Sequence, residues 1–448
     1  MSQSAPPRSA RDVARAVIAR VDRGGAYATL ALDGELARAG LDERDRRLAT
    51  ELVYGALRHR LRLERALTAH ADLGRAPPPV RHALLLAAYQ LLLMRVPAHA
   101  AVDDAVGAVR ARHGAKLAGF VNAVLRKLAA AGEPPLPTEP RARIAALHSL
   151  PPWIVDELAG QLGDDELDEA AAALATPPTL WARVNVARAT PDDVAARLTA
   201  EGATVERSPI HAAALALRGA GDPAASASFQ AGLWTVQDLG AQLVGALAAP
   251  AAGDRILDAC AGLGGKTTHL AELAVAAGGP ATIDAIDRAV AKLGLLERTA
   301  RRLGLATIRT VAAELGADPP ALAAAYDLVV LDAPCSGLGV LRRHPEAKAR
   351  LVAADVTALA RIQAGLLEAA AVRVAAGGVL VYAVCTFTRA EGPEQLAAFL
   401  GRHPDFTIEA PPPALAAVAD GGAMRTWPHR HGADGFFAVR LRRAKIGS

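Results

Sequence analysis

Two of the three cysteines stand where a thiol could do chemistry. Cys335 comes shortly after the hydrophobic run Val329–Leu331 and Asp332, and Cys385 ends the run that begins at Leu380. A lone buried cysteine is more often a small hydrophobic residue than a nucleophile. Two cysteines at the ends of neighbouring predicted strands favour a chemical role instead. The cysteines lack the close pair spacing of a zinc site and no histidine cluster joins them, so we expect no bound metal.

A glycine-rich loop precedes both cysteines and is typical of a ligand-binding turn. It leads from a predicted strand into a predicted helix and has the residues Cys260, Ala261, Gly262, Leu263, Gly264, Gly265 and Lys266. The glycine spacing matches neither a Walker phosphate loop nor a dinucleotide fingerprint. About 20 residues further on, Asp287 ends the next predicted strand, where an acid can accept hydrogen bonds from ribose hydroxyls. This pattern favours a cofactor that contains a nucleoside, and the structural alternative is that Asp287 only caps the following helix.

The chemistry that needs a thiolate beside a nucleoside cofactor includes methylation of a pyrimidine carbon. Carbon 5 of cytosine is a weak nucleophile, and addition of a thiolate to carbon 6 makes it reactive. After methyl transfer the carbon-5 proton must leave and the thiolate must be expelled, which a second cysteine or a nearby base could assist. An acid near N3 and N4 of the base would stabilise the charge of the adduct, and Asp332 suits that role.

The elements that must position these residues alternate between strand and helix from Asp254 onward. Strands are predicted at 254–259, 281–287, 307–312, 326–332 and 378–384, with helices at 266–275, 289–303, 357–375 and 391–400. This alternation is typical of a parallel, doubly wound sheet with ligands at the carboxyl ends of its strands. Residues 436–441 are predicted to add an antiparallel edge strand.

The N-terminal part of the chain has a different pattern. Apolar residues at helical spacing over the first 130 residues predict a bundle of five or six helices, including a helix or helix pair from Leu41 to His70 with Asp42 as its cap. The proline-rich residues 131–150 are predicted to be a linker. A small α+β element follows, with strands predicted at 181–186, where apolar and polar residues alternate, and at 203–206, and a helix at 191–201. We therefore expect a multidomain protein: an all-α bundle (1–132), a linker with an α+β subdomain (133–245) and an α/β domain (246–448).

Composition narrows the function classes further. The chain has 448 residues, is 52% hydrophobic and 21% charged, and carries a net charge of only +4. No apolar run is long enough for a membrane span, and the arginine-rich start has no signal-peptide core, so we expect a cytoplasmic protein with reduced thiols. Basic residues crowd at 58–62, 342–344 and 440–443, where they form either a nucleic-acid surface or ordinary solvated faces.

Several motifs together resemble the RNA cytosine-5 methyltransferases that use S-adenosylmethionine. They are the loop Cys260–Thr267, the run Asp332–Ser336 followed by Arg342–Pro345, and the run Tyr382–Cys385, with further matches at 236–238, 427–429 and 434–437. The helical part resembles the NusB family through residues 96–102 and 120–126. The resemblance implies a Rossmann-like methyltransferase domain joined to an RNA-binding helical domain.

The resemblance also implies a role for each matched position. Cys385 is the expected nucleophile, Cys335 assists release of the product, and Asp332 with Lys266 contacts the target base. Asp287 is expected to hold the ribose of S-adenosylmethionine, and the glycine loop to pass close to its methionine end. Where the family has an aspartate toward adenine this chain has Ala312 and Ala313, so Glu314 is the candidate substitute.

The expected activity is methylation of carbon 5 of a cytosine in small-subunit (16S) ribosomal RNA through a covalent cysteine adduct. The expected partner is ribosomal RNA, with no membrane, and the expected state is a monomer. Two alternatives stay open: a tRNA cytosine-5 methyltransferase, and a non-catalytic RNA-binding assembly factor. The only feature that favours ribosomal RNA over tRNA is the helical domain. This is an analogy between folds, which does not determine the substrate.

Overall fold

The structure is a computed structural model that describes residues 9–316 and 322–445. The chain divides into two compact units. The first contains the residues up to Thr176 together with the segment Leu341–Leu351, and the second contains Pro177–Val340 and the chain from Val352 onward. Within the described ranges, no helix combines the length and apolar character that a bilayer crossing requires.

The first unit is helical, as the apolar spacing predicts. Its helices are α1 (Ala10–Gly24), α2 (Ala28–Ala39), α3 (Glu43–Arg58), α4 (Arg60–Thr68), α5 (Pro78–Leu92), α6 (Ala98–Ala131), α7 (Pro140–His148), α8 (Pro152–Leu162) and α9 (Leu167–Leu174). Buried alanine, valine and leucine side chains of α1 to α6 form one core. The predicted cap is present, because the Asp42 carboxylate accepts a hydrogen bond of 2.8 Å from the backbone of Asp45 at the start of α3.

One detail of this unit differs from the sequence prediction. Residues 131–150 are not all linker, since α7 lies within them and Glu139 caps its first turn through the backbone N–H groups of Arg141 and Ala142. Pro140, one of the prolines that suggested a linker, occupies the first position of α7, where its missing N–H costs nothing. Helix α6 is interrupted at Gly114 (φ 83°), where the backbone leaves helical geometry.

The segment Leu341–Leu351 is held by the helical unit although it follows Cys335 by only a few residues. The Glu346 carboxylate accepts a hydrogen bond of 3.0 Å from the backbone of Ala28, at the start of α2. The Arg350 guanidinium donates to three carbonyl groups at and beyond the end of α1, at 2.6 to 3.0 Å. Cationic groups are favoured at the carboxyl end of a helix, so this contact is stabilising for both partners.

The second unit begins with a small antiparallel sheet. Its strands are β1 (Leu180–Val184), β2 (Thr204–Arg207), β3 (Ala214–Arg218) and β4 (Trp234–Val236), in the order β2-β3-β1-β4. Helices α10 (Pro191–Ala200) and α11 (Ala227–Gln230) accompany it. The α+β character agrees with the sequence prediction, which found β1, α10 and β2 but not β3 or β4.

Nine strands form the larger sheet of the described residues, in the order β11-β12-β13-β9-β8-β5-β6-β7, with β10 paired to β13. Strands β5 to β9 run parallel, and β10 to β13 add an antiparallel part. The strands are β5 (Arg255–Asp258), β6 (Thr282–Asp287), β7 (Ile308–Ala312), β8 (Tyr326–Asp332), β9 (Val374–Val384), β10 (Phe406–Glu409), β11 (Ala419–Asp420), β12 (Ala423–Thr426) and β13 (Phe436–Arg443).

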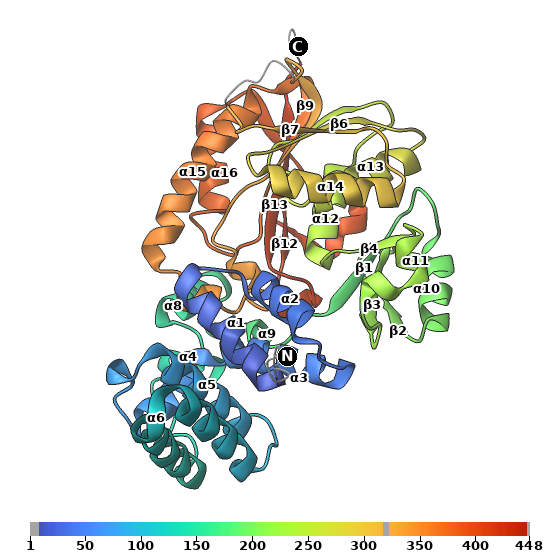
Figure 1. Cartoon of the computed structure of the whole chain (residues 1–448). Helices are drawn as coiled ribbons and strands as arrows, with labels where there is room; N and C mark the ends of the chain where they lie inside the picture. Colours follow the sequence, from blue (N-terminus) through green and yellow to red (C-terminus); the bar gives the residue numbers. More distant parts are fainter. Residues whose placement is uncertain (1–8, 317–321, 446–448) are drawn as a thin grey trace. The chain divides into compact units, whose positions relative to one another are not determined.

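Alternation along the strands gives this sheet two apolar faces. Ile256, Val330 and Val381 pack with α12 (Leu239–Ala248) and α13 (Gly265–Ala276), and α14 (Val290–Leu303) covers the same face beside Ala285. The intervening Leu257 and its neighbours pack with α15 (Ala353–Ala371) and α16 (Pro393–Arg402) on the other face. Figure 1 shows these two helical layers on either side of the sheet. The predicted doubly wound architecture is confirmed.

One predicted strand has a different place in the sheet. Residues 436–441 were expected at an edge, but β13 lies between β9 and β12 and also pairs with β10. The short strands β10 and β12 give little period-2 signal in the sequence, so their cover of β13 was not predictable from local pattern.

Candidate active site

The predicted site residues lie at the carboxyl ends of the parallel strands. β5 has β6 on one side and β8 on the other, so the strand order reverses there and leaves a crevice beyond the strand ends. The glycine loop follows β5 at this point. The first residues of α13 follow the loop, and the Lys266 ammonium donates a hydrogen bond of 2.6 Å to the Asp332 carboxylate at the end of β8. Two of the four predicted catalytic side chains are thus in direct contact.

The two predicted catalytic thiols are also in contact, since the sulfur atoms of Cys335 and Cys385 lie 3.3 Å apart. They follow the neighbouring parallel strands β8 and β9. The backbone of Gly339 donates a hydrogen bond of 3.0 Å to the carbonyl of Cys385 and accepts one of 2.9 Å from Gly435. A Cβ atom at Gly339 would lie 1.9 Å from the Gly435 carbonyl oxygen, so only glycine permits this close approach of the two cysteine loops.

The surroundings of Lys266 and Cys335 raise the pKa values of both groups. Burial would lower the pKa of Lys266, but the ion pair and hydrogen bond with Asp332 outweigh it and raise that pKa, with a further contribution from Cys385. Lys266 is therefore a cation. The hydrogen bond with Cys385 and burial raise the pKa of Cys335 well above its usual value, and the charges of Glu391 and Asp332 act in the same direction. This keeps a proton on Cys335.

The predicted cofactor loop is built as a backbone cradle. Gly264 has a φ of 82°, and a Cβ there would lie 2.3 Å from the Leu296 side chain, so the turn requires glycine. Asp287 ends β6 and accepts hydrogen bonds from the backbone of Gly262 (3.0 Å) and of Ala289 (2.8 Å). It therefore fixes the loop and the entry to α14 at once.

The remaining predicted cofactor residues lie on or beside this loop. Leu263 is 59% exposed, whereas Ala261 is buried. Burial, followed by the charges of neighbouring aspartates, raises the pKa of Cys260 to about 12, which makes it an inert thiol. Glu314 is exposed and stands two residues beyond the end of β7, at the same edge of the sheet.

Asp258, the last residue of β5, was not predicted and is buried below the loop. Its Oδ2 accepts a hydrogen bond of 2.6 Å from the Thr267 hydroxyl, while its Oδ1 is buried and accepts no hydrogen bond from the residues that the structure describes. Burial raises the pKa of Asp258 to about 6. A buried carboxylate oxygen that accepts no hydrogen bond lowers the stability of the fold unless a ligand supplies the donor. The Oδ1 atom of Asp258 is therefore suited to a cationic group of a bound molecule.

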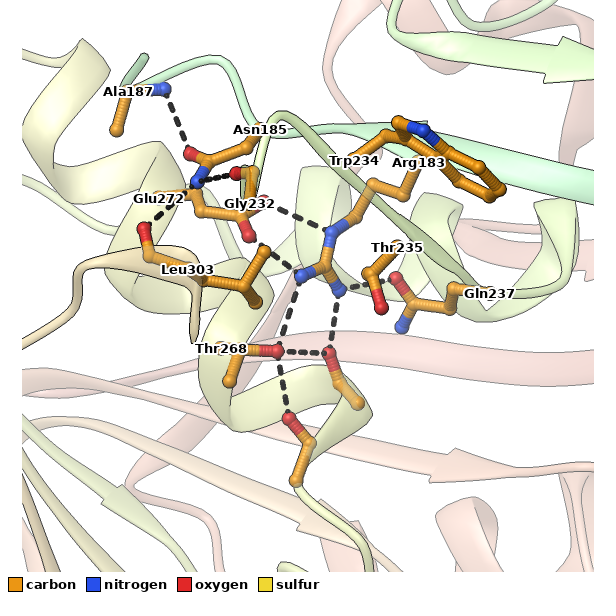
Figure 2. Close-up of polar contacts among 12 residues, drawn as sticks. Arg183, Asn185, Ala187, Gly232, Trp234, Thr235, Gln237, Thr268, Glu272 and Leu303 are labelled. Carbon is orange, nitrogen blue, oxygen red and sulfur yellow. Dashed lines mark hydrogen bonds and ion pairs between the residues drawn. The ribbon is translucent and has the colours of Figure 1, made fainter. Parts of the chain in front are cut away.

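The start of α13 is anchored by Arg183, a fully buried residue of β1 that sequence reasoning missed (Figure 2). Its guanidinium forms a bidentate ion pair with Glu272 at 2.9 and 2.7 Å. It also donates to the carbonyl of Gly265 (2.7 Å), the hydroxyl of Thr268 (3.0 Å) and the side chain of Gln237 (2.6 Å). The small sheet thus holds the helix that carries Lys266.

Asn185, which directly follows β1, links the same segment to α14. The side-chain amide of Asn185 donates to the carbonyls of Gly232 (2.9 Å) and Leu303 (3.0 Å), the latter at the end of α14 (Figure 2). The alternating run around β1 gave only a strand signal in the sequence. The partners of Arg183 and Asn185 are far away along the chain, so local pattern carried no information about them.

The basic clusters of the sequence are mostly engaged within the fold. Arg60 pairs with Asp22 and Glu64, and Arg62 pairs with Glu133. Further ion pairs join Arg440 and Arg442 to Glu409, and Arg443 to Asp405; Arg58 and Arg342 are buried. The structural interpretation of these clusters is therefore the better one for most of their arginines.

Comparison with known proteins assigns a family to each part of the chain. Residues 8–130 match the model of the NusB family, residues 150–223 that of the ferredoxin-like domain of RsmF/B-like methyltransferases, and residues 245–442 that of the 16S rRNA methyltransferase RsmB/F. Together they confirm the predicted fold class.

Relatives and solved structures agree along nearly the whole chain. The chain is 38% identical to the ribosomal RNA small subunit methyltransferase B of Thermus thermophilus, over 97% of both chains, and 35% identical to that of Xylella fastidiosa, over 98% of this chain and 99% of the relative. The crystal structure of PH0851 shares the fold with a TM-score of 0.83 at 24% identity, covering 99% of this chain and all of the other. The structure of NSun6 from Pyrococcus horikoshii with SFG has a TM-score of 0.60 at 21% identity, covering 66% of this chain and 98% of that chain. The chain therefore belongs to the RsmB/F family of 16S rRNA methyltransferases.

Proposed function

We propose that this rRNA methyltransferase transfers a methyl group to carbon 5 of a cytosine in 16S ribosomal RNA, and that it does so through a covalent adduct with Cys385. The observation that carries the proposal is the pair of thiols 3.3 Å apart beside the Lys266–Asp332 ion pair. A methyl acceptor with adequate nucleophilicity of its own needs no thiol, whereas carbon 5 of cytosine does. We place the activity in the cytoplasm, where ribosomal RNA is the substrate, and expect a monomer.

S-adenosylmethionine is the cofactor of this methyltransferase family, and the residues present suit it. The glycine loop and Asp287 offer the cradle for the nucleoside, and the unpartnered Oδ1 of Asp258 suits the cationic methionine end. Glu314 is the candidate contact for adenine. When bound, S-adenosylmethionine supplies the methyl group that is transferred.

The first step belongs to Cys385 and the ion pair. The thiolate of Cys385 adds to carbon 6 of the cytosine, so that a C–S bond forms and electron density moves to carbon 5. We expect Asp332 to accept a hydrogen bond from the N4 amino group and so to orient the base, while the Lys266 ammonium stabilises the negative charge that the addition moves into the ring. Lys266 keeps Asp332 in place through the 2.6 Å hydrogen bond and contributes positive charge to the same site.

The second step belongs to Cys335. After methylation, carbon 5 carries both a methyl group and a proton. Cys335 accepts that proton, the double bond between carbons 5 and 6 forms again, and the bond between carbon 6 and Cys385 breaks. Cys335 must first release its own proton to solvent, and its raised pKa then makes the thiolate a strong base. The proton taken from carbon 5 restores the Cys335 thiol, and breakage of the bond to carbon 6 restores the Cys385 thiolate.

Replacement of Cys385 with alanine tests the proposal. The variant should form no covalent RNA adduct and no 5-methylcytosine, while its affinity for S-adenosylmethionine changes less than about twofold, because the thiol is not part of the cofactor cradle. Methylation is measured with 16S rRNA from cells that lack the enzyme, and the base is identified by bisulfite sequencing. A Cys385→Ala protein that still makes 5-methylcytosine would refute the nucleophile.

The same assay separates the two alternatives. Preferred methylation of tRNA over 16S rRNA would favour a tRNA enzyme. A wild-type chain that shows no saturable binding of radiolabelled S-adenosylmethionine would favour a non-catalytic assembly factor.

A further inference from the structure

Glu391 is a buried acid near the two thiols that the proposed mechanism does not use. Its side chain is fully buried and its carboxylate accepts four hydrogen bonds. One oxygen accepts from the backbone of Ser336 (2.8 Å) and from the amide of Gln363 (2.9 Å). The other accepts from the hydroxyls of Ser336 (2.6 Å) and Thr388 (2.9 Å). All four donors are neutral groups, so each contact is a directed hydrogen bond and not an ion pair.

Three of the four donors come from the loops of the two cysteines, and the fourth, Gln363, lies on α15. Ser336 directly follows Cys335, and Thr388 stands three residues after Cys385. The hydroxyl of Ser336 also lies 2.9 Å from that of Thr386, the residue after Cys385. The Glu391 carboxylate therefore joins the two loops on the protein side of the thiol pair.

An ordinary structural role as a helix cap does not explain this arrangement. Helix α16 begins two residues later, its N-cap is Gly392, and it has no side-chain cap hydrogen bond. The backbone of Glu391 is itself fixed, because the Tyr382 hydroxyl donates a hydrogen bond of 2.6 Å to its carbonyl. The side chain is thus directed away from its own helix and toward Ser336.

We propose that Glu391 is a positioning residue that holds the Cys335 loop against the turn after Cys385, so that Cys335 meets the carbon-5 proton of the adduct. This inference rests on the proposed function. Formation of the adduct needs only Cys385 and the ion pair, whereas its resolution needs Cys335 at the correct distance from carbon 5. A shift of Ser336 moves Cys335 directly, because the two residues share a peptide bond.

Replacement of Glu391 with glutamine is the direct test. Glutamine has nearly the same volume as glutamate, but its amide NH₂ is a donor where glutamate has an acceptor oxygen. The NH₂ group would oppose two hydrogen-bond donors and displace the Ser336 loop. We expect release of methylated RNA to slow by about tenfold or more. The covalent RNA adduct, seen on denaturing gels, should accumulate, with the rate of adduct formation and the affinity for S-adenosylmethionine within about twofold of wild type.

Glu394→Gln is the matched control. Glu394 stands three residues further along the chain, is exposed and forms its ion pair with Arg389, which is itself on the surface. This variant should turn over like wild type. If Glu391→Gln fails to fold, Thr388→Val removes one of the four donors at nearly constant shape and should slow release by a few-fold in the same direction.

The outcomes distinguish the inference from the proposed function. A folded Glu391→Gln protein with wild-type release, or one that loses adduct formation itself, overturns the positioning role. If Thr388→Val carries the test, wild-type release in that variant overturns it likewise. An active wild-type enzyme without any Cys385-dependent adduct overturns the proposed mechanism instead.

Discussion

At the scale of single residues, the buried carboxylate of Asp258 lowers the stability of the fold at neutral pH and is suited to bind a ligand. Folding raises its pKa from 3.8 to about 6, so the folded chain binds this proton more tightly than the unfolded chain. The corresponding contribution to stability is present below about pH 4 and is lost as the pH rises through 6. The carboxylate is retained at neutral pH at a site that faces the cofactor loop, which is typical of a functional residue.

Asp258→Asn should flatten this pH dependence. Between pH 4 and pH 8 the free energy of unfolding of the wild type should fall by about 3 kcal/mol relative to that of the variant. Urea unfolding without cofactor at both pH values measures the difference. Parallel pH profiles of the two proteins would contradict the burial argument. The variant should also bind S-adenosylmethionine more weakly, because its amide does not attract a cation.

The chemistry-bearing residues were the most predictable part of the site. Asp332, Cys335 and Cys385 stand at or just beyond the ends of strands that the sequence pattern locates, and parallel neighbours bring such ends to one edge. Lys266 follows the glycine loop after a third such strand and reaches the same edge. Glu391 was not predictable in this way. Its partner Ser336 lies 55 residues earlier in the chain, and nothing in the local sequence marks the contact.

At the scale of elements, the buried pair Arg183–Glu272 joins the small sheet to the helix that follows the glycine loop. Both side chains are inaccessible to solvent, and removal of one partner leaves the other charge buried and unpaired. The arrangement makes the small sheet a structural support for the proposed cofactor site.

Arg183→Met should lower the free energy of unfolding by about 3–5 kcal/mol, and the double variant Arg183→Met/Glu272→Leu should recover much of that loss. Both variants should bind S-adenosylmethionine more weakly, since neither restores the hydrogen bond to the Gly265 carbonyl. Urea unfolding and calorimetric titration measure the two effects. If cofactor affinity stays at the wild-type value in both, the pair serves stability alone.

Element types were predicted well where the signal is local. Helices with a capping residue and an apolar stripe, such as α3, and the long buried strands β8 and β9 follow directly from residue spacing. Short strands such as β4 and β12 depend on their neighbours for pairing, so the central place of β13 could not be inferred.

At the scale of the whole molecule, the segment Leu341–Leu351 is the feature that sequence reasoning did not anticipate. For its basic residues the sequence left open a nucleic-acid surface or an ordinary solvated face. In the structure Glu346 and Lys348 are buried, and the segment is bound to helices of the first unit. Burial and the nearby Arg58 charge lower the pKa of Lys348 to about 7, and its ammonium donates to the Arg58 carbonyl.

Arg350→Ala should loosen this segment without unfolding either unit. The variant loses the hydrogen bonds to the carbonyls that end α1, so hydrogen exchange of amides in 341–351 should accelerate by about tenfold, given one or two net hydrogen bonds lost. Arg361→Ala, an exposed arginine of α15, is the control and should leave exchange unchanged. Equal exchange in both variants would mean that Arg350 does not hold the segment.

The placement of residues 341–351 in the helical unit also limits how the genes of such proteins can recombine. The polypeptide passes from one unit to the other after Thr176, after Val340 and again after Leu351. A single crossover at the first of these junctions would join the helical bundle of one protein to the rest of another protein. The bundle would then have to bind a segment 341–351 from a different sequence. Shuffling the halves of related enzymes therefore demands that the eleven-residue insert travel with its N-terminal host.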